Sequence, residues 1–251
     1  MENQTVPQNS LQKATNPLGR PLTIVFALPG KTFSNNFLLS WTMLFNYCLN
    51  NGINPLITNH YSNNIYYVRN MCLGGNSVRG INQKPFNGEL EYDFVMWIDS
   101  DQVFRVEDFV KLLQHDKDIV SGIYLMEKGK EFATVETMND EVFTRKGHYD
   151  FLTPEEVMLR RKKEMPPLMK VDYTGMGWML VKNGVFEKLK YPWFSPEWRE
   201  MTLTDASGVE HKISEFTMED VAFCQKVKQL GIDVLVDTNV VIGHEKSVVM
   251  G

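Results

Sequence analysis

The stretch Phe94-Val95-Met96-Trp97-Ile98-Asp99-Ser100-Asp101 decides the fold of this chain and the place of its chemistry. Five apolar residues in a row are typical of a strand that is buried on both faces. Two carboxylates spaced i, i+2 at the end of that strand can share one hard cation, which can in turn hold a diphosphate. The stretch therefore favours chemistry on a nucleotide or another phosphate substrate.

The segments around this strand alternate between strand and helix patterns. Strand-like apolar runs occupy residues 22–28, 56–58, 94–98 and 118–124. Helical spacing of apolar residues occurs at 37–48, 65–73 and 106–113. This alternation predicts an α/β doubly wound sheet, in which ligands bind at the carboxyl ends of the strands. Asp99 and Asp101 lie at such an end.

The alternation fails after about residue 125. We expect a loop-rich insertion over residues 138–170, built around one charged helix from Pro154 to Lys163. The remaining predicted elements are strands at 132–137, 171–181, 234–236 and 240–242, a hairpin at 201–214 that turns at Asp205 to Gly208, and a helix at 217–230. Glycines at 175 and 177 interrupt the strand at 171–181, as in a bulge or where a substrate approaches bare backbone.

Composition places the chain among ordinary globular proteins. Of its 251 residues, 43% are apolar and 23% charged, which suits one domain over residues 21–251 after a flexible arm at 1–20. No run approaches the roughly 20 apolar residues of a membrane span, and the first twenty residues lack the apolar core of a signal peptide. Cys48, Cys72 and Cys224 are far apart and suit a reduced core. We expect a soluble, cytoplasmic protein, in the host cytoplasm if the chain is viral.

The acidic pair alone fits two unrelated enzyme classes. A haloacid-dehalogenase-like phosphatase would use Asp99 as nucleophile, and Asp99 to Val103 fits its D-x-D-x-[TV] pattern. A nucleotide-sugar transferase would instead use the pair to reach a metal and the sugar nucleotide. The phosphatase motif normally ends the first strand of its sheet, whereas two β-α units precede it here. This position favours the transferase.

Four further patterns each allow a structural and a functional interpretation. Thr217 with Asp220 three positions later is typical of a capping box, yet a carboxylate there can also act as a general base. His244 follows an apolar strand and is a loop residue or a metal ligand. The glycine pair before Trp178 is a bulge or a point of close substrate approach, in which case Trp178 is an aromatic platform for a sugar. Arg69 is a surface cation or a diphosphate ligand.

Together these pieces resemble the GT-A glycosyltransferases, the nucleotide-diphospho-sugar transferase fold, and most closely their inverting family-2-like branch. The resemblance covers about residues 22–246 and implies a mixed, mainly parallel sheet. It also implies a nucleotide-binding half at about 21–124 and an acceptor half at about 125–251. Four motifs come in the same order: Asp99-Ser100-Asp101 as DxD, Thr174 to Trp178 as the acceptor loop, Met218-Glu219-Asp220 as xED, and His244 as the C-terminal histidine.

The resemblance implies a role for each matching residue. Asp101 and His244, with Asp99 beside them, would hold Mn²⁺ or Mg²⁺ and the donor diphosphate, and Asp99 would also contact the ribose or sugar. Asp220 would deprotonate the acceptor hydroxyl, and Glu219 would help to hold a substrate. The other implied contacts are Pro29, Arg69 and Ser100 on the nucleotide side and Gly175, Met176, Gly177 and Trp178 around the acceptor.

The expected activity is transfer of a sugar, with inversion, from a nucleotide diphosphate, a UDP-sugar before a GDP-sugar. The net charge of −5 favours a glycan or small-molecule acceptor. A protein or hydroxymethylated DNA remains open through the basic run Arg160 to Lys163. A non-catalytic sugar-binding module of the same fold is a further alternative. The insertion at 138–170 and the hairpin at 201–214 lie outside the family core and are expected to shape acceptor choice.

Overall fold

The computed structural model describes residues 20–204 and 207–246. Its helices are α1 Asn35–Asn50, α2 Ile65–Cys72, α3 Val106–His115, α4 Asp140–Lys146, α5 Pro154–Lys162 and α6 Glu219–Gln229. Its strands are β1 Leu22–Ala27, β2 Ile53–Thr58, β3 Phe94–Ile98, β4 Gln102–Val103, β5 Ile119–Tyr124, β6 Thr134–Val135, β7 Leu168–Val171, β8 Tyr173–Thr174, β9 Trp178–Lys182, β10 Glu197–Thr204, β11 Glu210–Thr217 and β12 Val234–His244.

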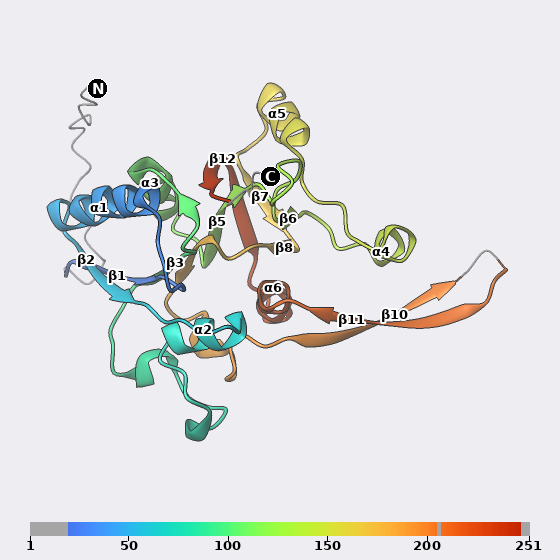
Figure 1. Cartoon of the computed structure of the whole chain (residues 1–251), viewed down its shortest axis with the longest axis horizontal. Helices are drawn as coiled ribbons and strands as arrows, with labels where there is room; N and C mark the ends of the chain where they lie inside the picture. The colour runs from blue at the N-terminus through green and yellow to red at the C-terminus, as the bar shows by residue number, and fades with distance from the viewer. Residues whose placement is uncertain (1–19, 205–206, 247–251) are drawn as a thin grey trace, which may run out of the picture.

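The core is a mixed sheet of eight strands (Figure 1). Its order is β2-β1-β3-β9-β5-β12-β4, with β7 also paired to β12. The pairs β1–β2, β1–β3 and β5–β12 are parallel, whereas β9 runs antiparallel between β3 and β5. The expected mixed α/β sheet is therefore confirmed. Because β9 enters the sheet antiparallel, the chain just before it lies at the carboxyl ends of β3 and β5.

Helices cover both faces of this sheet, which explains why β3 is apolar throughout. Helices α1 and α3 pack on one face, through side chains such as Leu44 and Phe109. Helices α2 and α6 pack on the other face, through side chains such as Val68 and Phe223. Figure 1 shows the two helix pairs on opposite sides of the strands. All five residues of β3 are consequently buried.

Several boundaries differ from the sequence expectations. The segments 234–236 and 240–242 form one strand, β12, whose pairing register with β5 shifts between Val236 and Val241. The strand expected at 132–137 is reduced to β6, and the insertion contains a second helix, α4, that its polar composition concealed. The hairpin is longer than expected, and residues 205 and 206 of its predicted turn lie outside the described residues, as do residues 1–19 of the predicted arm.

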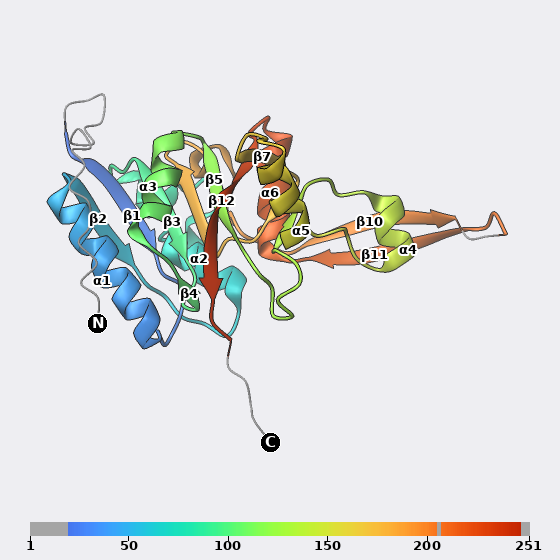
Figure 2. The ribbon, with the colours of Figure 1, turned by 90° about the horizontal axis from the view of Figure 1, so that it is seen from above.

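The hairpin β10–β11 projects from the body of the molecule (Figures 1 and 2). One of its faces rests on the insertion, because Arg199 hydrogen-bonds Asp140 and Tyr149 and Met201 is buried. The three cysteines are free and buried, as expected of core residues. Among the described residues, no helix is both long and apolar enough to cross a membrane.

Candidate functional site

Four segments that are distant in sequence meet at the carboxyl edge of the sheet. The loop after β3 carries Asp99 and Asp101, and β12 ends at His244 beside β4. The glycine turn before β9 lies against the same loop, since the backbone N–H of Asp99 donates to the Gly177 carbonyl at 3.0 Å. Helix α6 begins at Glu219 and Asp220. This edge is where open α/β sheets bind ligands.

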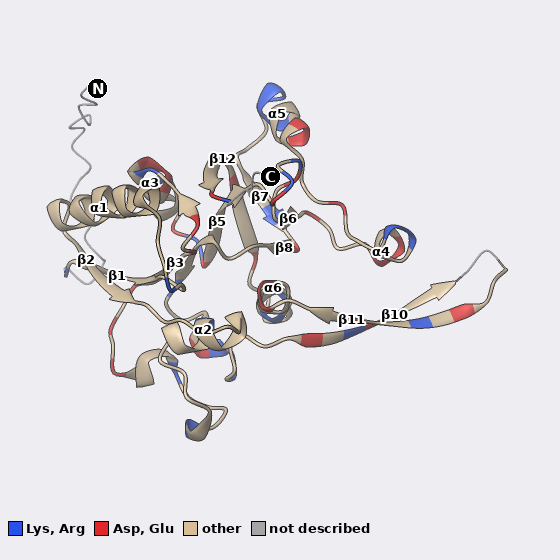
Figure 3. Cartoon of the chain, viewed as in Figure 1, with Lys and Arg blue, Asp and Glu red and all other residues tan. Residues whose placement is uncertain are grey.

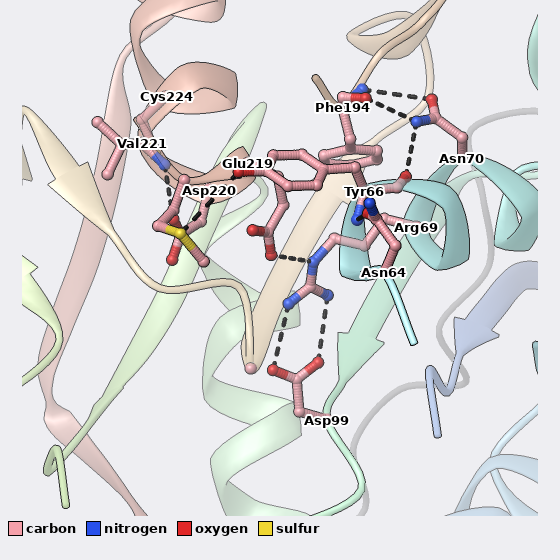
Figure 4. Close-up of polar contacts among 12 residues, drawn as sticks. Asn64, Tyr66, Arg69, Asn70, Asp99, Phe194, Glu219, Asp220, Val221 and Cys224 are labelled. Atoms are coloured by element: carbon pink, nitrogen blue, oxygen red, sulfur yellow. Dashed lines mark hydrogen bonds and ion pairs between the residues drawn. The ribbon is translucent and has the colours of Figure 1, made fainter. Parts of the chain in front are cut away.

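Arg69 joins two of these segments from inside the protein (Figure 4). Its Nη1 and Nη2 donate to the two oxygens of Asp99, each at 3.2 Å. Its Nε donates to Glu219 Oε1 at 2.9 Å, and its guanidinium lies 5.5 Å from the Trp97 ring centroid. The Arg69 side chain is only 3% exposed. The two acidic motifs, 120 residues apart in the chain, therefore share one buried cation.

This geometry corrects the sequence expectation for Arg69. Residue 69 is not a surface cation, because its guanidinium is buried and binds two carboxylates. Burial alone would lower the pKa of Arg69, but the charges of Asp99 and Glu219 outweigh burial and raise it. Arg69 is thus a permanent counter-ion for both carboxylates. Its charge keeps Glu219, which is only 4% exposed, in position.

Asp101 faces His244 and Lys246. His244 Nε2 lies 3.0 Å from Asp101 Oδ2, and Lys246 Nζ lies 2.7 Å from the same oxygen. Burial alone would raise the pKa of Asp101, but the hydrogen bonds from His244 and Lys246 lower it to about 2. The hydrogen bond to Asp101 raises the pKa of His244. Sequence reasoning missed Lys246, because a single lysine after a strand has no distinguishing pattern.

The His244 ring is oriented as in a metal-binding histidine. Its Nδ1 lies 2.6 Å from the Leu125 carbonyl oxygen, which can only accept, so Nδ1 carries a hydrogen. In the neutral ring, Nε2 then directs a lone pair at the Asp101 carboxylate. The lone pair and the carboxylate repel each other unless a cation lies between them. A backbone carbonyl that fixes one ring nitrogen is the usual support of a histidine ligand. Asp101 and His244 thus supply a carboxylate and an imidazole, two ligand types that divalent cations accept.

Asp99 does not join this pair, since Arg69 holds both of its oxygens. Within the two described ranges, no three His, Cys, Asp or Glu side chains are grouped so that they could hold a metal ion. The expected three-residue ligand set is therefore reduced to two protein groups. Any further ligands of a cation would come from a substrate or from water.

Asp220 follows Glu219 in the first turn of α6. Its Oδ2 accepts from the Tyr173 hydroxyl at 3.2 Å, and its Oδ1 accepts from the Val221 N–H at 2.8 Å. Burial and the nearby charge of Glu219 raise the pKa of Asp220 to about 7, although Arg69 opposes the shift. A carboxyl with this pKa can take a proton near neutral pH.

The capping-box interpretation of Thr217 is wrong. Met218 is the N-cap of α6 and makes no side-chain capping bond. The Thr217 hydroxyl instead donates to the carbonyl of Glu197 and accepts from its N–H, because residue 217 ends β11 and pairs with β10. Asp220 is thereby left without the capping role expected of it.

The glycine turn serves internal packing. A Cβ added at Gly175 would lie 2.1 Å from the hydroxyl oxygen of Tyr124, and one at Gly177 would lie 2.8 Å from the Gln102 amide nitrogen. The Tyr124 hydroxyl accepts from the Gly177 N–H at 3.0 Å. Gln102 is fully buried, and neither of its amide atoms has a partner within the described part of the chain. Sequence reasoning missed Tyr124 and Gln102, because only tertiary packing brings them here.

Two residues of the expected acceptor loop present no surface to a ligand. Trp178 is fully buried and stacks on Phe104 at a centroid distance of 4.5 Å, so it is a core residue and not a sugar platform. Met176 is likewise 1% exposed. On the other side of the DxD loop, Pro29 is buried and Gly30 packs so closely on Ser100 that a Cβ would lie 2.7 Å from the Ser100 Cβ.

Comparisons with known proteins give remote likenesses only. No protein-family model matches the chain, and neither does any curated protein. Among solved structures, A197 from STIV is similar over 92% of this chain and 97% of its own, with 16% identity and a TM-score of 0.46. GalNAc-T7, solved with UDP, GalNAc and Mn²⁺, is similar over 90% of this chain and 44% of its own, with 11% identity and a TM-score of 0.43. At these values neither likeness assigns a function to this chain.

Proposed function

We propose that this protein is a metal-dependent glycosyltransferase of the GT-A type, which moves a sugar from a nucleotide-diphosphate donor to a hydroxyl acceptor with inversion. The observation that carries the proposal is the pairing of Asp101 with His244, whose Nδ1 is fixed by a backbone carbonyl. This pair lies at the same sheet edge as Asp220, the half-buried carboxyl with a pKa of about 7. A cation site and a base at one edge suit group transfer from a diphosphate.

The donor would lie at the DxD loop. Asp101 and His244 would hold Mn²⁺ or Mg²⁺, which as a Lewis acid neutralises the charge that develops on a leaving diphosphate. When the metal binds, Lys246 would have to release Asp101 Oδ2. The Lys246 ammonium would then be free to contact an anionic ligand. Ser100, packed against Gly30, would form the wall on the nucleotide side. A UDP-sugar is the favoured donor and a GDP-sugar the second choice.

The acceptor would approach Asp220. The acceptor hydroxyl would lose its proton to an oxygen of Asp220 as its own oxygen attacks the anomeric carbon from the face opposite the leaving group. The bond from that carbon to the diphosphate oxygen breaks, and the diphosphate leaves with the electron pair. Tyr173 would hold the carboxylate in position through its hydroxyl. Glu219, paired with Arg69 and buried, would act as a positioning residue.

The insertion extends the acceptor side. The Phe151 ring lies 6.4 Å from the Tyr173 ring, and a hollow of about 280 Å³ opens beside Phe151 and Leu152. Glu136, Asp150 and Glu156 also line this hollow. An acidic hollow next to the residue that holds Asp220 suits an uncharged acceptor group better than an anionic one.

The phosphatase alternative has weaker support. Its nucleophile would be Asp99, yet both oxygens of that carboxylate accept from Arg69, and the guanidinium is itself buried. A nucleophilic carboxylate needs an oxygen free to attack phosphorus. The non-catalytic module differs from our proposal only in what Asp220 does, and experiment can separate the two.

The test measures ligand binding and turnover separately. Nucleoside diphosphates and sugar nucleotides, each with and without Mn²⁺, are screened for an increase in thermal stability. A ligand present at a hundred times its Kd raises the free energy of unfolding by about 2.7 kcal/mol. Asp101→Asn and His244→Ala should abolish the Mn²⁺-dependent part of the stabilisation, whereas the control Asp116→Asn, at a side chain that is 72% exposed, should keep it. Asp220→Asn should keep donor binding and lose transfer. If no nucleotide stabilises the protein, the proposal fails; binding without any release of nucleoside diphosphate would identify a non-catalytic module.

A further inference from the structure

The two faces of the projecting hairpin differ in character. Residues of β10 and β11 that point one way, such as Arg199 and Met201, pack toward the insertion. The opposite face carries the cross-strand pair Trp198 and Phe216, followed by the exposed pair Glu200 and Ser214. This second face is thus polar except for one aromatic pair.

The aromatic pair extends to the body of the protein. The Trp198 and Phe216 rings meet edge to face at 5.1 Å, and the Phe216 ring meets the Tyr66 ring of α2 at 6.3 Å. We call these three side chains the aromatic platform. Trp198 is 72% exposed and Phe216 is 42% exposed. Because nearly three quarters of the Trp198 side chain is exposed, most of its indole is open to a ligand.

The platform is continuous with the proposed site. The Tyr66 hydroxyl donates to the Thr217 carbonyl oxygen at 3.3 Å, at the point where β11 leads into α6 (Figure 4 shows Tyr66 beside Glu219). Asp220 follows three residues later in the chain. The charges of Glu219 and Asp220 add to burial in raising the pKa of Tyr66, which agrees with this proximity. A ligand that extends beyond Asp220 toward the hairpin would therefore meet the platform.

The size and charge of the platform define its ligand. At roughly 150–250 Å² per aromatic side chain, the exposed parts of Trp198 and Phe216 amount to about 250 Å², far below the roughly 800 Å² that each partner gives to a standard protein interface. The two strands carry four glutamates against one arginine and one lysine (Figure 3). A small apolar surface on an acidic arm suits a neutral ligand and not a polyanion.

We propose that the aromatic platform is a subsite for a neutral oligosaccharide, whose end unit is the acceptor at Asp220. The C–H face of a pyranose ring carries partial positive charge and stacks on the negative face of the Trp198 indole. The Glu200 carboxylate, next along the same strand face, accepts hydrogen bonds from the sugar hydroxyls. Trp198 thereby takes the part that the sequence suggested for Trp178. This inference rests on the proposed function but has its own test.

The test uses the tryptophans as internal reporters. Trp97, Trp178 and Trp193 are fully buried and Trp41 is partly buried, so Trp198 is the tryptophan most open to acrylamide. Malto-, cello- and chito-oligosaccharides, from the monosaccharide to the hexasaccharide, should protect the protein from acrylamide quenching, and longer chains should protect more. Calorimetry measures the affinity for the saccharide directly. Trp198→Ala should raise the Kd by roughly tenfold or more, the loss expected when one aromatic face is removed. Trp198→Phe should restore part of the affinity.

Controls separate the platform from the donor site. Met158→Ala removes an equally exposed apolar side chain from α5 and should leave saccharide binding unchanged. Metal-dependent donor binding is measured separately and should be the same in Trp198→Ala as in the parent. A failure of the proposed function would therefore appear in donor binding and not in saccharide binding. The subsite is overturned if no neutral saccharide protects Trp198, if Trp198→Ala binds as tightly as the parent, or if only a heparin hexasaccharide binds. Concentration-dependent dimerisation that Trp198→Ala abolishes would also overturn it, in favour of a second copy.

Discussion

Replacing Arg69 by methionine should be among the most damaging single changes in the molecule. Methionine fills a similar volume but leaves Asp99 and Glu219 without their shared cation. The side chains of these carboxylates are 27% and 5% exposed, so solvent can reach one of them and hardly reach the other. Stability should suffer because a buried charge is left uncompensated, not because the ion pair itself is strongly stabilising.

The magnitude follows from this burial. Removing one partner of a buried ion pair typically costs about 3–5 kcal/mol, out of a total of about 5–15 kcal/mol for a domain. Removing the second buried charge as well should recover much of the loss, so Arg69→Met combined with Glu219→Gln should be more stable than Arg69→Met alone. The loss in free energy of unfolding caused by Arg69→Met should also become smaller as the pH falls toward 4. An unpaired buried glutamate takes up a proton there, so the buried charge disappears.

Urea denaturation followed by circular dichroism measures these differences. Lys146→Met is the matched control, since it breaks an ion pair whose side chains are 40% and 61% exposed, and it should cost less than about 1 kcal/mol. Arg69→Met should lower the urea midpoint with an unchanged m-value. If it costs no more than the control, or if the double variant is no better than Arg69→Met alone, Arg69 is not the buried counter-ion described here.

Further outcomes are expected at three other positions, Asp220, Lys246 and Gly175. Asp220→Asn should lower transfer by several orders of magnitude with donor affinity kept; in the parent, kcat should rise with pH and level off above about 7, where Asp220 is ionised. The same raised pKa should make the parent lose stability as the pH rises from about 4 to 7, a slope that Asp220→Asn should lack in urea titrations. Lys246→Ala should tighten Mn²⁺ binding about two- to fivefold by calorimetry, since an exposed ion pair that competes for Asp101 disappears; weaker binding would refute the competition. Gly175→Ala should cost about 1–3 kcal/mol because the new methyl meets Tyr124, and adding Tyr124→Phe should return part of it; a neutral Gly175→Ala would show that the turn can move.

Much of the fold was predictable because local patterns and burial agree. The strands and helices of residues 22–124 match the expected runs closely, since buried parallel strands are apolar throughout and amphipathic helices repeat every three to four residues. The insertion was harder to predict. Helix α4 has no buried residue, so no apolar spacing predicts it. Its place is explained by its Asn139 cap, by the contacts of Asp140 with the hairpin and by the packing of Phe143 on Tyr149.

The candidate site was predictable in its members but not in their partners. Asp101 and His244 were expected together and lie together, because both follow strands that end at the same edge. Arg69 and Trp178 were assigned to ligands, yet both are turned inward. A sequence shows that an arginine or a tryptophan is present, but its exposure depends on neighbours that are distant in the chain.

The printed residues were sufficient to determine the class of the fold and the edge of the sheet where chemistry should occur, since strand order along the chain and polar residues at strand ends are local properties. The tertiary structure alone decided which charges meet. It pairs Arg69 with both Asp99 and Glu219, and it places Asp101 against His244 and Lys246. It also exposes Trp198 and buries Trp178. The physical reason is that electrostatic pairing and burial depend on separation in space, which sequence spacing does not measure.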